Sequence, residues 1–220
     1  MHPVATIWRS RAAAEGSVHA YAVRIQRDLA ALDPSQAVVD LAARMVDDEA
    51  RHVEVCLDVA ARFDGQRGAR PAPRGGVDLV DDAPAALQPL LRLFGSCIGE
   101  SIAAVWIDRS AADVRAPWLR EVLRAHLADE VHHARIGWAH LASNRVSEDD
   151  REELGAWLPR LLDASLTAWR WFPDVWPADG FPEEGLPSHA VTFAAIDEAV
   201  DEVVLPGFAR YGVAIDGVVR

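Results

Sequence analysis

The sequence predicts an all-α protein, built as a four-helix bundle with a long crossover loop and two additional C-terminal helices. Apolar residues recur every three or four positions over long stretches, and no stretch shows the period-2 alternation of a half-buried strand. Pro and Gly cluster at a few breaks between these stretches. Because the chain has 220 residues, half of them hydrophobic, we expect a single domain over residues 1–220.

The first two helices are expected over residues 10–32 and 35–63. Asp33-Pro34 separates them, because the residue before a proline is disfavoured in helical conformation. Each helix carries Glu or His inside an otherwise apolar stripe. The stripes consist of Glu15, Val18, Ala22, Ile25, Leu29 and Leu32 in the first helix, and of Val38, Ala42, Met45, Glu49, His52, Cys56, Val59 and Phe63 in the second.

Residues 64–82 are rich in Gly, Pro and Arg and predict a crossover loop. A domain linker is not expected here, since neither half of the chain could bury its stripe alone. The third helix is expected over residues 84–112, and the fourth runs from Pro117 to about residue 143, with proline in its first turn. Short, long and short connections indicate a four-helix core over residues 10–143.

The C-terminal part, residues 144–220, is expected to cover this core. Ser147 and Asp150 have the spacing of a capping box that starts a fifth helix, which Pro159 should kink or restart. Four of the eight Trp fall in residues 157–176, where frequent Pro predicts an ordered lid. A sixth helix is expected over residues 188–211, with an acidic face.

Composition excludes several classes of protein. The 22 cationic residues are all Arg, so Schiff-base lysine chemistry and a Walker-type phosphate loop are excluded. A net charge of −12 argues against nucleic acid or an anionic membrane as a partner. Two Cys, no signal-like N-terminus and no run of eighteen uncharged apolar residues lead us to expect a cytoplasmic protein.

The pattern Asp-Glu-x-x-His occurs twice, at residues 48–52 and 129–133, and each copy follows an in-stripe Glu on the preceding helix. Residues three apart on a helix point the same way, so each Glu-x-x-His offers two ligands to one site. Four carboxylates and two imidazoles from four helices are the ligands of a di-iron or di-manganese site. These candidate ligands are Glu15, Glu49, His52, Glu100, Glu130 and His133.

A purely structural polar layer is the alternative, but burying four carboxylates without a cation would cost several kcal/mol each. Asp48 and Asp129 are candidates for a supporting role, in which each accepts the free ring N–H of the His on the opposite helix. His126 lies four residues before Glu130 and seven before His133, so a third imidazole reaches the same site. The alternative for His126 is a hydrogen-bonded core histidine.

With these residues in place, the sequence resembles the ferritin-like di-iron superfamily, and more narrowly the arylamine N-oxygenases typified by p-aminobenzoate N-oxygenase. The similarity covers residues 10–143 and includes the extra histidine before the second Glu. The resemblance implies seven iron ligands, namely Glu15, Glu49, His52, Glu100, His126, Glu130 and His133. It further implies a cytoplasmic oxygenase in which two iron ions and dioxygen oxidise an amine nitrogen.

The resulting expectation is an enzyme with two iron ions, or manganese at one or both positions. Its partners would be dioxygen, an external electron donor and a small molecule, with an aromatic amine as one option. The protein would be a monomer or small homo-oligomer. A ferroxidase, an iron-storage subunit, a peroxidase-type protein and an inert metal-stabilised scaffold share much of the ligand pattern and remain alternatives. Cys56 and Cys97 are interpreted as small core residues.

Overall fold

The computed structural model describes residues 2–32, 35–72, 80–170 and 175–218. Every regular element in these ranges is a helix, apart from one isolated bridge between Phe181 and Leu186. The all-α prediction is therefore confirmed for the described residues.

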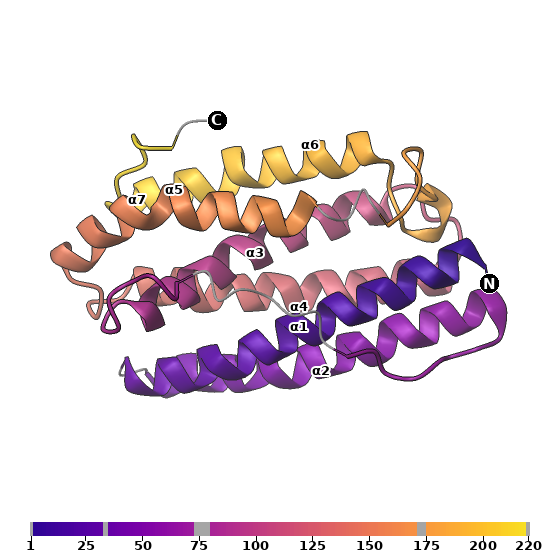
Figure 1. Ribbon diagram of the computed structural model, residues 1–220, viewed down its shortest axis with the longest axis horizontal. Helices are drawn as coiled ribbons and strands as arrows, with labels where there is room; N and C mark the ends of the chain where they lie inside the picture. Colours follow the sequence, from indigo (N-terminus) through magenta and orange to yellow (C-terminus); the bar gives the residue numbers. More distant parts are fainter. Residues whose placement is uncertain (1, 33–34, 73–79, 171–174, 219–220) are drawn as a thin grey trace.

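Four long helices form the bundle: α1 (Pro3–Ala31), α2 (Gln36–Asp64), α3 (Gln88–Ala111) and α4 (Pro117–Leu141). α1 packs on α2, α2 on α4, α4 on α3 and α3 on α1, so the four helices enclose one interior. α2 ends and α3 begins at opposite ends of the bundle, and the two helices therefore run in the same direction (Figure 1). Residues 73–79 of the expected crossover loop lie outside the described residues.

The first helix starts earlier than the sequence pattern predicts. α1 begins at Pro3 rather than near residue 10, with the proline in its first turn, where no N–H is needed. Val4, Ile7 and Trp8 are each at most 2% exposed. This first part of α1 is held by tertiary packing, which the periodicity of the sequence did not reveal.

A local signal accounts for the end of α2. Gly65 ends the helix with φ of 76°, a left-handed conformation that favours glycine, whereas Ser35 at the N-cap is extended and its side chain makes no cap hydrogen bond. α3 begins at Gln88, four residues later than expected. Pro84 opens a separate turn instead, in which its carbonyl oxygen accepts hydrogen bonds from the N–H groups of Leu87 and Gln88.

α5 (Glu148–Arg170) begins with the expected capping box. The N–H of Ser147 donates to Asp150 at 2.8 Å, and the N–H of Asp150 donates to Oγ of Ser147 at 3.1 Å. The helix does not restart at Pro159, which lies inside one continuous element. Buried leucines on both sides of the proline, including Leu158 and Leu161, compensate for the missing hydrogen bond.

The C-terminal helices lie along α3. The segment consists of α6 (His189–Ala199), a π-helical turn (Val200–Val204) and α7 (Leu205–Arg210), preceded by a short 3-10 helix at Pro182–Glu184. The π turn interrupts the expected continuous helix just before Pro206, which has no N–H to donate. α5 and α6 both pack against α3 and form a second layer over the bundle (Figure 1).

Two glycines allow close contacts between helices. A β-carbon at Gly137 of α4 would lie 2.5 Å from Cβ of Cys97 on α3, so these backbones approach more closely than any larger residue permits. A β-carbon at Gly207 would lie 2.6 Å from the ring of Trp138. The glycine at 137 and the small Cys97 thus set the spacing of α3 and α4.

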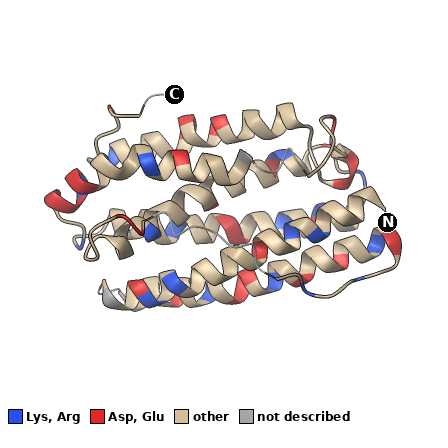
Figure 2. Ribbon diagram, in the orientation of Figure 1, with Lys and Arg blue, Asp and Glu red and all other residues tan. Residues whose placement is uncertain are grey.

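Charged residues are spread along α1, α2, α4 and α5, and acidic residues gather at the first turn of α5 (Figure 2). α3 is by contrast long and apolar enough to cross a membrane by composition alone. Because 72% of its most apolar window is buried inside the protein, α3 has the character of a core helix.

Candidate metal centre

All seven ligands predicted from the sequence come together inside the four-helix bundle. Their ligand atoms form two groups, each with its atoms within 4.8 Å of one another. The first group is Glu15, His52, His126 and Glu130, and the second group is Glu49, Glu100, Glu130 and His133. Each of the four helices contributes, and Glu130 belongs to both groups. The buried Glu and His side chains are compatible with a metal site.

The glutamate of each Glu-x-x-His pair faces both groups. One oxygen of Glu130 lies 2.8 Å from Nε2 of His126, and its other oxygen lies 3.2 Å from Nδ1 of His133. Glu49 is arranged in the same way, with one oxygen 2.9 Å from Nδ1 of His133 and the other 3.6 Å from Nδ1 of His52. Both carboxylates therefore direct their two oxygens toward different histidine rings of the cluster.

The glutamates on α1 and α3 lie at opposite ends of the cluster. Glu15 faces His126, with 3.8 Å between the carboxylate oxygen and Nε2. Glu100 faces Nδ1 of His133 at 4.0 Å. The duplicated sequence pattern thus becomes an approximate twofold arrangement, and His126 is the addition that makes the first group richer in nitrogen.

Several of the ligand atoms converge without satisfying one another. Both carboxylate oxygens of Glu49, Nδ1 of His52 and both ring nitrogens of His126 are buried and have no hydrogen-bond partner. The short distances that these atoms make are therefore contacts without hydrogen-bond alignment, whereas Nδ1 of His133 and Glu130 form a hydrogen bond at 3.2 Å. Buried polar atoms in this state are unfavourable, so their convergence fits a bound cation as the missing partner.

Two aspartates fix the rings from outside. Nε2 of His52 on α2 lies 3.3 Å from Asp129 on α4, and Nε2 of His133 on α4 lies 3.4 Å from Asp48 on α2. Both aspartates are buried, so the contact expected between each aspartate and the histidine of the opposite helix is present. This contact turns Nδ1 of both rings toward the cluster.

Two arginines that the sequence analysis did not single out join the aspartates. Nη2 of Arg51 contacts both carboxylates, at 2.5 Å from Asp48 and 3.0 Å from Asp129. Arg44 contacts the same two carboxylates at 3.3 and 3.5 Å. Arg44 and Arg51 precede and follow Asp48 by four and three residues, a spacing that places side chains on one helix face and was the available sequence signal.

The electrostatics of the cluster show an excess of negative charge. Burial lowers the pKa of His52, but the adjacent carboxylate of Glu49 and the charge of Glu130 outweigh it and raise that pKa to about 9. Burial also lowers the pKa of His133, but its contacts with the Glu130 and Glu49 carboxylates outweigh this effect and raise that pKa to about 11. Burial and the neighbouring carboxylates raise the pKa of Glu100 well above its usual range. The cluster therefore holds protons wherever it lacks another cation.

The two cysteines lie in the hydrophobic core. Both are free and buried, and burial raises the pKa of each thiol. A neutral buried thiol is a poor ligand and nucleophile, which agrees with their interpretation as small core residues.

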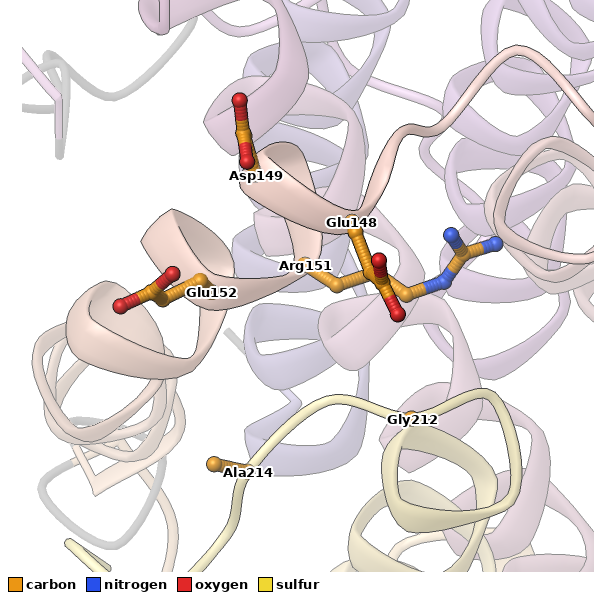
Figure 3. Close-up of a pocket in the computed structure, with 6 residues that line it drawn as sticks. All are labelled: Glu148, Asp149, Arg151, Glu152, Gly212 and Ala214. Atoms are coloured by element: carbon orange, nitrogen blue, oxygen red, sulfur yellow. The ribbon is translucent and has the colours of Figure 1, made fainter.

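A separate surface depression lies between the start of α5 and the segment after α7 (Figure 3). Glu148, Asp149, Arg151, Glu152, Gly212 and Ala214 line it. Arg151 already donates hydrogen bonds to the carbonyl oxygens of Val146 and Leu141. None of the seven candidate ligands reaches this depression, so it is not an entrance to the cluster.

Comparisons with protein-family models, with curated proteins and with solved structures find no match to this chain.

Proposed function

We propose that this protein is a ferritin-like di-iron oxygenase that uses dioxygen to oxidise a small molecule, with an amine nitrogen as the favoured point of attack. The observation that carries the proposal is the twofold cluster, in which Glu49 and Glu130 each face two groups of ligand atoms. Four carboxylates balance the charge of two divalent ions, and carboxylate and imidazole are ligands that iron and manganese accept.

Each candidate ligand has a distinct role in the proposed centre. Glu15, His52 and His126 would hold one ion, Glu100 and His133 the other, and Glu49 and Glu130 would span both. Bound iron, reduced by an external donor, supplies the capacity to reduce dioxygen and to transfer oxygen to a substrate. With metal bound, Asp48 and Asp129 would accept the Nε2–H of His133 and His52 and so leave Nδ1 of each ring free to hold an ion.

Burial by the apolar residues of the four helices excludes bulk water from the cluster. Among the seven candidate ligands, Glu15 is the most accessible, with 13% of its side chain exposed, whereas Glu49 is fully buried. Glu15 is therefore the candidate ligand closest to solvent, and the α1 side is the proposed direction of approach for small molecules. A dry surrounding limits side reactions of activated oxygen.

Metal stoichiometry tests the proposal first. The purified protein should bind two ferrous ions per chain under anaerobic conditions. Glu130→Ala should lose both ions, because this carboxylate belongs to both groups, whereas Glu15→Ala should lose one. Glu121→Ala, an exposed glutamate on the same helix as Glu130, serves as the matched control and should keep both. Unchanged stoichiometry in Glu130→Ala would contradict the assignment of the cluster.

Oxygen chemistry tests the proposal second. The reduced diferrous protein should consume dioxygen and place labelled oxygen from ¹⁸O₂ into an amine from a substrate panel. His133→Ala should abolish this product, and His132→Ala, which changes the neighbouring half-exposed histidine, should not. Two ions bound without any oxygenated product would leave the metal cluster standing and refute the oxygenase.

A ferroxidase or iron-storage role is the second candidate, because six of the seven ligands, without His126, also suit that chemistry. Storage requires a large hollow assembly that mineralises iron beyond two ions per chain. Size-exclusion chromatography with light scattering separates the two candidates, since an oxygenase of this kind is expected to be a monomer or small homo-oligomer.

A further inference from the structure

One serine beside the candidate metal centre departs from the usual behaviour of serine in a helix. Ser17, Ser101 and Ser110 each donate from Oγ to the carbonyl oxygen four residues earlier, at 2.7–3.2 Å. Ser96 lies on α3 one turn before Glu100, is 9% exposed and donates forward to Oε1 of this glutamate at 3.4 Å. Its hydroxyl is therefore directed at a candidate ligand.

The packing of α1 on α3 explains why Ser96 does not donate backward. The carbonyl oxygen four residues before it belongs to Arg92, and the hydroxyl of Tyr21 on α1 donates to that oxygen at 3.3 Å. In a helix the same oxygen also accepts the backbone N–H of Ser96, so both of its lone pairs are engaged. A β-carbon at Gly95 would lie 3.7 Å from the Tyr21 hydroxyl, so the two helices are in close contact here. Oγ of Ser96 is consequently left for Glu100.

This contact engages one oxygen of Glu100 and leaves the other for the cluster. Oε2 of Glu100 faces Nδ1 of His133 at 4.0 Å, whereas Oε1 accepts the hydrogen bond of the serine hydroxyl. Carboxylates bind metal ions through one oxygen or through both. A carboxylate with one oxygen held from outside presents the other oxygen alone to an ion of the second group.

The equivalent position in the other half of the twofold arrangement makes no such contact. Arg11 lies one turn before Glu15 on α1, the place that the serine has before Glu100. Its guanidinium packs on the rings of Trp8 and Trp106, with Cζ 4.2 and 4.7 Å from the ring centres. Nη1 of Arg11 is buried and has no hydrogen-bond partner, and among the described residues none donates a hydrogen bond to Glu15. The two glutamates are therefore held differently.

We propose that Ser96 is a positioning residue that keeps Glu100 bound to the second ion through one oxygen only. The hydrogen bond to Oε1 preserves a coordination position on that ion, which a carboxylate bound through both oxygens would fill. Glu15, which lacks such a contact, is free to bind through one or both oxygens. The two metal positions would thus differ in coordination in spite of the duplicated sequence pattern. This inference rests on the proposed function for the presence of two ions.

Infrared spectra of the zinc-loaded, full-length protein test the binding mode directly. The two carboxylate stretching bands lie farther apart when one oxygen binds the metal than when both do, and zinc is redox-inert, so no oxygen chemistry intervenes. Ser96→Ala should keep the fold and two ions per chain, since alanine suits a helix interior. The difference spectrum against wild type should show one pair of carboxylate bands with a narrowed separation. Unchanged carboxylate bands would overturn the proposal.

Cobalt provides a second readout that loss of a hydrogen bond alone would not move. An additional ligand atom lowers the intensity of the visible bands of Co²⁺. One of the two Co²⁺ binding steps in Ser96→Ala should therefore give weaker visible absorption than in wild type. Equal absorption in both proteins would show that Glu100 keeps its binding mode without the serine and would overturn the proposal.

Two matched variants separate the hydroxyl from packing. Ser96→Thr retains a hydroxyl and should keep the wild-type infrared and visible spectra. Ser110→Ala removes another buried serine of α3, whose Oγ donates to the carbonyl oxygen of Trp106, and should leave both spectra unchanged. A change in Ser110→Ala, or a change in Ser96→Thr equal to that in Ser96→Ala, would assign the effect to packing and overturn the proposal.

Metal content, measured before the spectra, keeps this proposal separate from the proposed function. Wild type without two ions per chain would refute the metal centre and this proposal together. Two ions per chain with unaltered spectra in Ser96→Ala would refute only the role of Ser96 and leave the metal centre in place.

Discussion

Replacement of Asp129 by alanine is expected to weaken the first group and to spare the second. Asp129 is 6% exposed, and its Oδ2 lies 3.3 Å from Nε2 of His52. Without this acceptor, the ring of His52 loses the contact that fixes its tautomer and its direction. His133 keeps its own contact with Asp48, so the second group retains its support.

The magnitude follows from the type of contact. Loss of the outer hydrogen-bond partner of a ligating histidine typically lowers metal affinity by about 10–100-fold, or about 1.4–2.8 kcal/mol. The fold should survive the change. The other partners of Asp129 are Arg51 and Arg44, whose side chains are 47% and 54% exposed, and ion pairs with exposed side chains contribute about 0–1 kcal/mol.

Stepwise titration with Co²⁺ against a competing chelator measures the two affinities separately through visible absorption. Asp129→Ala should shift one binding step and leave the other in place. Asp48→Ala is the mirror variant and should shift the second group, while Asp47→Ala, which changes the exposed neighbour of Asp48 on α2, is the control and should shift neither. Equal weakening of both steps by Asp129→Ala, or the same weakening by Asp47→Ala, would refute the separate support of the two rings.

Three further predictions follow from the cluster and the packing. His126→Ala should keep its helical circular dichroism and weaken metal binding in the first group; unchanged metal content and turnover would remove its role as a ligand. The pKa values of His52 and His133 are raised to about 9 and 11, so their protonated rings stabilise the metal-free fold fully below about pH 6.5, and this stabilisation is lost as the pH rises through 9. The free energy of urea unfolding should therefore decline over this pH range in the metal-free protein, and metal loading should abolish the decline. Gly137→Ala should lower the unfolding free energy by about 1–3 kcal/mol, since its Cβ would lie 2.5 Å from a side-chain atom of α3, whereas Gly99→Ala meets no atom within 4 Å and should be neutral or stabilising in thermal unfolding.

Much of the bundle could be predicted because its signals are local. The apolar stripes, Gly65 at the end of α2 and the capping box at Ser147 all act on residues within one or two helical turns. The start of α1 was missed for the opposite reason. Trp8 is buried by its tertiary surroundings, including the hydrogen bond to Glu184 from a distant part of the chain.

The candidate site was likewise predictable only where its residues lie close together in the sequence. Helical spacing placed Glu49 with His52 and Glu130 with His133 without a structure, because three residues span less than one turn. Helical spacing did not reveal that Arg11 lies between two Trp rings from α1 and α3. Nor did it reveal that Nη1 of Arg11 has no hydrogen-bond partner among the described residues. A buried arginine has no periodic signature of its own.

The sequence by itself determined the all-α class and the seven residues that form the buried cluster, because helical periodicity converts spacing into direction. Only the tertiary structure decided which atoms meet across helices. It gave Glu49 and Glu130 their orientation toward both groups, joined Asp48 and Asp129 through Arg51, and enclosed Arg11 between two indole rings. Contacts between helices depend on how four surfaces fit together, and that fit follows from side-chain packing throughout the bundle.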